Sequence, residues 1–83
     1  MPKWNEFQPS DFEYDYERDE LHAHHITVKE AVQCFYNPFS IKRNKSFKDR
    51  FKLIGHTDSG RKLIVIFQLK RHNVVRIITG WEA

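Results

Sequence analysis

Residues 49–79, DRFKLIGHTDSGRKLIVIFQLKRHNVVRIIT, decide the fold of this chain. Within them, Leu63–Phe67 is an unbroken apolar run rich in β-branched residues, which is the pattern of a strand buried on both faces. The segments on either side, Arg50–Gly55 and Val74–Thr79, mix apolar and basic positions, as partly exposed strands do. Turn-forming residues separate the three segments, so the sequence predicts an antiparallel meander of three strands.

Two helices are predicted ahead of this meander. The first covers residues 16 to about 24, with Asp15 well placed as its N-cap. The second follows Thr27, which has the capping-box relation to Glu30, and its apolar residues recur at helical spacing. It should end at Tyr36, because the Asn-Pro pair that follows disfavours a helix.

The order of these segments predicts an α+β fold, with two N-terminal helices packed on one face of a small antiparallel sheet of three to four strands. Phe39–Ile41 is the candidate fourth strand at the sheet edge, and Phe12–Asp15 is a short edge strand or an extended lead-in. Two helices can cover only one face of such a sheet, so the other face is expected to stay open. Residues 1–10 are expected to form an N-terminal arm, and residues 11–83 a single domain.

The net charge of +3 conceals a strong asymmetry along the chain. Residues 1–36 carry three bases and eight acids, whereas residues 37–83 carry eleven bases and three acids. An acidic front half and a basic back half favour a basic face that binds a polyanion such as nucleic acid. The alternative is that these charges only keep the surface soluble.

Composition disfavours several other classes of protein. The single cysteine, Cys34, excludes an internal disulfide and a cysteine-cluster zinc site, and it is expected to be a buried structural thiol. The chain has only three glycines and no phosphate-binding glycine motif, so no cofactor is expected. It has neither a signal-peptide pattern nor an apolar run long enough for a membrane span, and a cytoplasmic location is therefore expected.

Three histidines, His22, His24 and His25, lie close together in the sequence. Their spacings do not suit metal ligation on a helix, which needs residues three or four apart, and no metal site is predicted. The structural interpretation is that they are exposed or helix-end residues. His24 is nevertheless a candidate acid–base group or phosphate contact.

Basic residues at strand positions are the strongest functional signal. Arg50 and Lys52 share one face of their predicted strand, and Arg76 shares a face with Val74 and Ile78 on the third. Such cations can stabilise a phosphorane during RNA cleavage, or they can merely bind phosphates. Further candidate RNA contacts flank the sheet: Lys42, Arg43, Lys45, Lys48, His56, Lys70 and Arg71.

Several short motifs follow one another in a specific order. They are Phe12-Glu13-Tyr14-Asp15, His24-x-Ile26-Thr27-Val28-x-Glu30-Ala31, Phe35-x-Asn37-Pro38, Arg50-Phe51-Lys52-Leu53-Ile54-Gly55, Gly60-Arg61-x-Leu63-Ile64-Val65-Ile66-Phe67 and Arg76-Ile77-Ile78-Thr79. On these motifs, which span residues 12–79, the sequence resembles the BrnT family. The members of this family are RelE-like ribonuclease toxins of bacterial type II toxin–antitoxin systems.

The resemblance implies a compact α+β fold whose sheet binds messenger RNA. It also implies metal-independent endoribonuclease activity and neutralisation by a BrnA-like antitoxin. The expected assembly is either a homo-oligomer or a toxin–antitoxin hetero-oligomer. His24, Arg50, Lys52 and Arg76 correspond to polar positions of the family pattern and are the candidate catalytic residues.

Two alternatives remain open. The family pattern usually carries a Lys and an Asn on its first helix, where this chain offers only Arg18, Glu20 and the histidines. The pattern also usually ends in a strand reading Ile-Ser-Ala-Arg, where this chain has Ile78-Thr79-Gly80-Trp81. A non-catalytic relative that binds nucleic acid or protein, having lost an arginine, is therefore one alternative. An unrelated small α+β interaction domain is the other.

Overall fold

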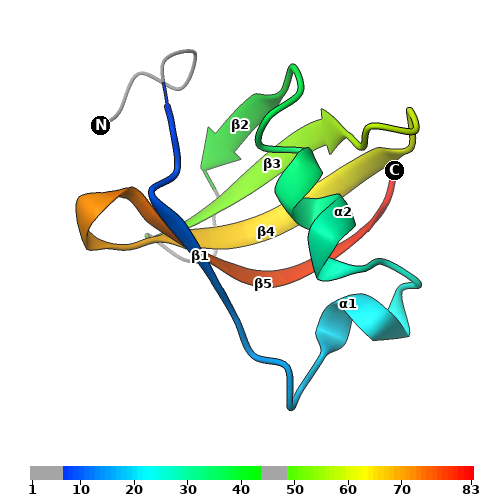
Figure 1. The fold of residues 1–83 in the computed structure, drawn as a ribbon, viewed down its shortest axis with the longest axis horizontal. Helices are drawn as coiled ribbons and strands as arrows, with labels where there is room; N and C mark the ends of the chain where they lie inside the picture. Colours follow the sequence, from blue (N-terminus) through cyan, green and yellow to red (C-terminus); the bar gives the residue numbers. More distant parts are fainter. Residues whose placement is uncertain (1–6, 44–48) are drawn as a thin grey trace.

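A computed structural model describes residues 7–43 and 49–83 as a five-stranded sheet with two short helices (Figure 1). The strands lie in the order β1-β5-β4-β3-β2, and β1 runs parallel to β5 while every other pairing is antiparallel. The elements are β1 (Asp11–Tyr14), α1 (Glu20–Ala23), α2 (Val28–Gln33), β2 (Ser40–Arg43), β3 (Arg50–His56), β4 (Lys62–Leu69), the 3₁₀ turn η2 (Arg71–Asn73) and β5 (Val74–Glu82).

The predicted fold class is wrong in two respects. The sheet has five strands and is mixed, because β1 adds to β5 in parallel rather than standing apart from a three- or four-stranded antiparallel sheet. The helices are short, four and six residues, instead of two full helices packed on the sheet. The meander itself is confirmed as β3, β4 and β5.

The first helix is shorter than predicted because Asp15 caps a turn instead. Its Oδ1 accepts hydrogen bonds from the backbone N–H groups of Glu17 and Arg18, at 3.1 and 3.3 Å. Asp19 then adopts a left-handed conformation with φ of 41°, which interrupts any helix that began at residue 16. The Tyr14 hydroxyl donates to the Asp19 carboxylate at 2.7 Å, and α1 begins only at the next residue.

The second helix begins as predicted, with a complete capping box between Thr27 and Glu30. It ends at Gln33, and the chain continues to Tyr36 in tighter turns in which the N–H groups of Phe35 and Tyr36 donate to carbonyls three residues back. The residues described here include no helix long and apolar enough to cross a membrane.

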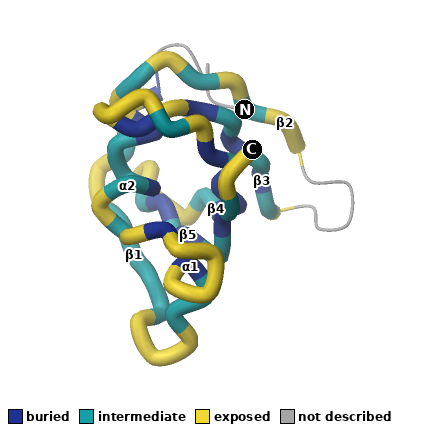
Figure 2. Tube along the Cα trace, turned by 90° about the vertical axis from the view of Figure 1, so that its right-hand side faces the viewer, coloured by how far each residue is buried: buried dark blue, intermediate teal, exposed yellow. Residues whose placement is uncertain are grey.

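The hydrophobic core lies between the helices and one face of the sheet. Fully buried residues of β3, β4 and β5 meet α1 and α2 there, and most residues around α1 are exposed (Figure 2). Cys34 is buried in this core, as predicted, and burial raises the pKa of its thiol to about 11. Phe7, from the predicted N-terminal arm, also packs into the core, whereas residues 1–6 lie outside the described part.

A β-bulge in β5 decides which side chains share the other face. Ile66 pairs with Thr79 and Phe67 with Ile77, so Ile78 has no partner of its own on β4. One extra residue inverts the alternation of side chains along a strand. Arg76 before the bulge and Trp81 after it therefore lie on the same face, which is the face opposite the helices.

Candidate functional site

The sheet face opposite the helices, called the open face here, contains a groove of about 400 Å³. Ile66 lies in its lining: this residue is only 7% exposed, yet it does not belong to the core cluster on the helix side. The lining comes from β3, β4, β5, the connection between β1 and α1, and the first residue of α1 at the edge of this face. It consists of Asp15, Arg18, Glu20, Arg50, Ile66, Arg76, Ile77, Ile78, Thr79 and Trp81.

Strand register brings two predicted site residues into this groove. Arg50 of β3 pairs with Gln68 of β4, and Gln68 pairs with Arg76 of β5. The two arginines therefore lie in one cross-strand row, with backbones about 10 Å apart across β4. Within the described part of the chain, the Arg76 side chain makes no hydrogen bond or ion pair. It can therefore bind a ligand without giving up a hydrogen bond or ion pair to a described residue.

The opposite wall of the groove is acidic. Arg18 and Glu20 form an ion pair of 2.9 Å on its rim, so they largely neutralise each other. Asp15 faces the groove as well, with one of its oxygens bound to the turn that it caps. The groove is thus cationic on the side of Arg50 and Arg76 and anionic on the side of the β1–α1 connection.

An aromatic residue completes the lining. Trp81 is partly exposed beside the two arginines, and its ring centroid lies 6.4 Å from that of His24, which follows α1. Guanidinium groups bind phosphates through charge-assisted hydrogen bonds, and an indole offers a surface on which a base can stack. The arrangement can therefore hold one phosphate together with an adjacent planar group.

The other predicted site residues are distributed less tightly. His24 is exposed and lies next to Trp81, outside the groove lining. Lys52 is on the open face two residues after Arg50 in β3, and it pairs with Ile66 of β4 and Lys42 of β2. It extends the basic surface without entering the groove.

Lys70 and Arg71 border a second hollow on the same face, which Glu13 and Gln68 also line. The ammonium of Lys70 is held 3.0 Å from the Glu13 carboxylate, so part of its charge is compensated. Arg43 and His56 lie exposed at the ends of β2 and β3. Lys45 and Lys48 lie outside the described residues.

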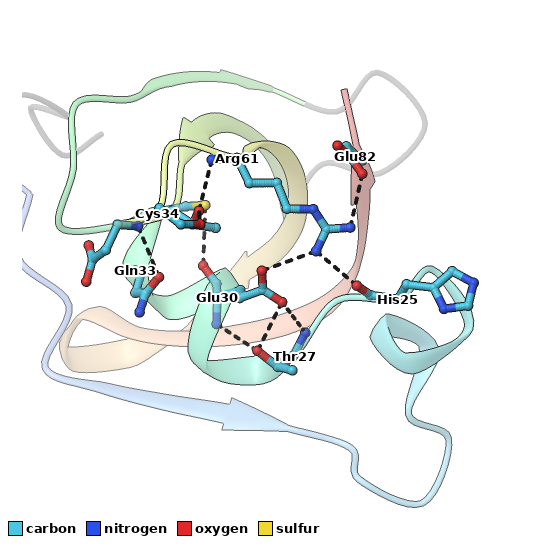
Figure 3. Close-up of polar contacts among 10 residues, drawn as sticks. His25, Thr27, Glu30, Gln33, Cys34, Arg61 and Glu82 are labelled. Carbon is cyan, nitrogen blue, oxygen red and sulfur yellow. Dashed lines mark hydrogen bonds and ion pairs between the residues drawn. The ribbon is translucent and has the colours of Figure 1, made fainter.

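A separate cluster of polar side chains among the described residues holds elements of the fold together. Arg61 donates to the carboxylates of Glu30 and Glu82, both at 3.1 Å, and to the carbonyl of His25 at 3.0 Å (Figure 3). The hydrogen bonds to Glu82 and then Glu30 raise the pKa of Arg61 above its ordinary value. These three hydrogen bonds join the β3–β4 turn to α2 and to the end of β5.

Sequence reasoning missed Arg18, Thr79 and Trp81 as groove residues. Arg18 reaches the groove from a turn that was assigned to a helix, and Thr79 and Trp81 reach it only because of the bulge at Ile78. The available signal was Gly80, since glycine inside a strand often marks a bulge or a close backbone approach.

Among the residues that the structure describes, no three His, Cys, Asp or Glu side chains form a group that could hold a metal ion. A scan against models of protein families finds no match to this sequence, and a search of curated proteins also finds none.

Proposed function

We propose that this protein binds RNA on the open face of its sheet and cleaves it as a metal-independent endoribonuclease. The observation that supports this most is that Arg50 and Arg76, from strands separated by β4, line one groove together with Trp81. Phosphate contacts supply most of the affinity of proteins for nucleic acid, and aromatic rings add stacking. Lys52 and Lys42 would extend the contact along the backbone.

Cleavage in this proposal uses the ribose 2′-hydroxyl as the nucleophile. The 2′-oxygen attacks the adjacent phosphorus while the bond to the 5′-oxygen breaks, giving a 2′,3′-cyclic phosphate and a 5′-hydroxyl end. Arg50 and Arg76 stabilise the added negative charge of the phosphorane. A base must take the proton of the 2′-hydroxyl and an acid must protonate the leaving 5′-oxygen. His24, which lies beside Trp81 outside the groove lining, is the candidate for one of these roles.

In a cell, we propose the role of the toxin in a type II toxin–antitoxin pair, acting in the cytoplasm. This part of the proposal follows from the resemblance to the BrnT family. A BrnA-like antitoxin would then be the protein partner, and it would neutralise the toxin in a hetero-oligomer. Growth arrest on expression, relieved by a neighbouring gene, is the expected cellular result.

The cleavage proposal is tested by incubating single-stranded messenger RNA with the purified protein in the presence of a metal chelator. Wild type should give fragments with 5′-hydroxyl ends, and Arg76→Ala should cut at least a hundredfold more slowly because the phosphorane loses a charge-assisted donor. Lys29→Ala is the matched control, since Lys29 is an exposed cation on α2. Intact RNA with wild type and control alike would contradict nuclease activity.

A second candidate function is RNA binding without cleavage. Two observations favour it: His24 lies outside the groove lining, and Glu20 is held by Arg18 instead of standing ready as a base. The same incubation separates the two functions. Retarded but uncut RNA, together with harmless expression in cells, would support a binding module.

A further inference from the structure

We propose that Trp81 is a base-stacking residue that makes the open-face groove selective for single-stranded RNA. This inference rests on the proposed RNA binding and names the form of the substrate. It concerns the position at which the BrnT pattern has an arginine and this chain has Trp81. The support comes from the backbone of β5, the neighbours of the indole and the charges around it.

The backbone fixes the direction in which Trp81 projects. The bulge at Ile78 transfers the following residues to the opposite alternation, and Trp81 then pairs with Ile64 on the open face. Gly80 holds this register because a Cβ at that position would lie 2.8 Å from the Ile64 carbonyl oxygen. At Gly80, the residue before Trp81, β5 is thus in close contact with β4. This contact limits rotation of β5 that would turn the indole toward the core.

The neighbours of the indole suit a stacking role. On the α1 side the imidazole of His24 lies against it, with the ring planes inclined by 54°. On the groove side it shares a lining with Arg50 and Arg76. A phosphate held between the arginines would therefore bring its own nucleotide, or the next one, beside the indole ring.

The position of the indole and the charges of the groove favour a single strand over a duplex. In A-form RNA the bases are stacked within the helix, so their faces are not accessible to a protein ring. Arg50 and Arg76 can contact one backbone on the cationic side, whereas the carboxylate of Asp15 on the other side would repel the phosphates of a second strand. An unpaired strand can instead turn a base toward Trp81.

The chain has two tryptophans, so a Trp4→Phe variant makes Trp81 the only tryptophan and its fluorescence a direct probe. Three ligands should be titrated: a single-stranded RNA oligonucleotide, the same strand annealed to its complement, and an abasic oligonucleotide of equal length. Stacking predicts quenching by the first ligand alone. In the wild-type background, Trp81→Ala should weaken single-strand binding about tenfold or more, and Trp81→Phe should retain most of the affinity.

Each outcome has a defined meaning. If single-stranded RNA binds without quenching Trp81, or quenches it no more than the abasic strand does, the stacking inference is overturned while RNA binding stands. If duplex binds as tightly as single strand, selectivity is overturned. If no RNA binds at all, the proposed function fails with it. Because the fluorescence variant keeps Trp81, a folding defect in Trp81→Ala does not affect the conclusion.

Discussion

At the scale of single residues, Glu30 illustrates how one carboxylate joins separate elements. It accepts hydrogen bonds from the backbone N–H of Thr27 and from Arg61, each at 3.1 Å. The bond from Thr27, followed by the contact with Arg61, lowers the pKa of Glu30 below 4.5. The pair with Arg61 is partly exposed, so solvent weakens it and its contribution to stability is modest.

The lowered pKa of Glu30 predicts a pH dependence of stability. A carboxylate whose pKa is lower in the folded state than in the unfolded state stabilises the fold above the unfolded value, here about 4.5, and loses that contribution as pH falls through the folded value. Denaturant midpoints of wild type and Glu30→Gln should therefore differ at neutral pH and converge as pH falls below 4.5. A gap between the two proteins that stays constant down to pH 3 would contradict the linkage.

At the scale of elements, β5 is the strand that organises the sheet. It pairs with β1 through Val74–Ile77 and with β4 along its length, and its edge beyond β1 lies beside α1 (Figure 1). Gly80 lies in the part of β5 beyond its pairing with β1, where the close approach to the Ile64 carbonyl leaves no space for a side chain. The position of Trp81 thus depends on a residue that has no side chain.

Gly80→Ala is therefore expected to destabilise the protein by about 1–3 kcal/mol, because a methyl group would force β5 away from the β4 backbone. The Cβ would also meet Leu21 of α1 at 3.2 Å. Chemical denaturation measures the free energy of unfolding directly. A variant as stable as wild type would show that β5 is not held against β4 at this point.

At the scale of the whole molecule, local patterns were sufficient for the meander and the basic face. The apolar run in β4 and the alternating basic positions of β3 depend on neighbours in the sequence, so they could be read without the fold. The parallel pairing of Asp11–Tyr14 with Val74–Ile77 could not be predicted in this way. It joins segments about sixty residues apart in the sequence, and all the other elements lie between them along the chain.

The site divides in the same way. Arg50 and Arg76 could be predicted to share a face, because the alternation of side chains along β3 and along β5 determines the face on which each arginine lies. Trp81 could not, because one unpaired residue, Ile78, inverts the alternation after Arg76. Arg18 was also out of reach, since its place depends on how Asp15 caps a turn instead of a helix.

The central claim is that the open face binds RNA through phosphate contacts at Arg76. The most direct measurement is the affinity of a single-stranded RNA for wild type, Arg76→Ala and Lys29→Ala over a series of salt concentrations. Binding by Arg76→Ala should be weaker by about tenfold, and its logarithmic salt dependence shallower by about 0.7, the value for one lost phosphate contact on a single strand. Lys29→Ala, which removes an exposed cation of α2 on the helix side of the sheet, should match wild type. Equal affinities and equal salt slopes for all three proteins would contradict the claim.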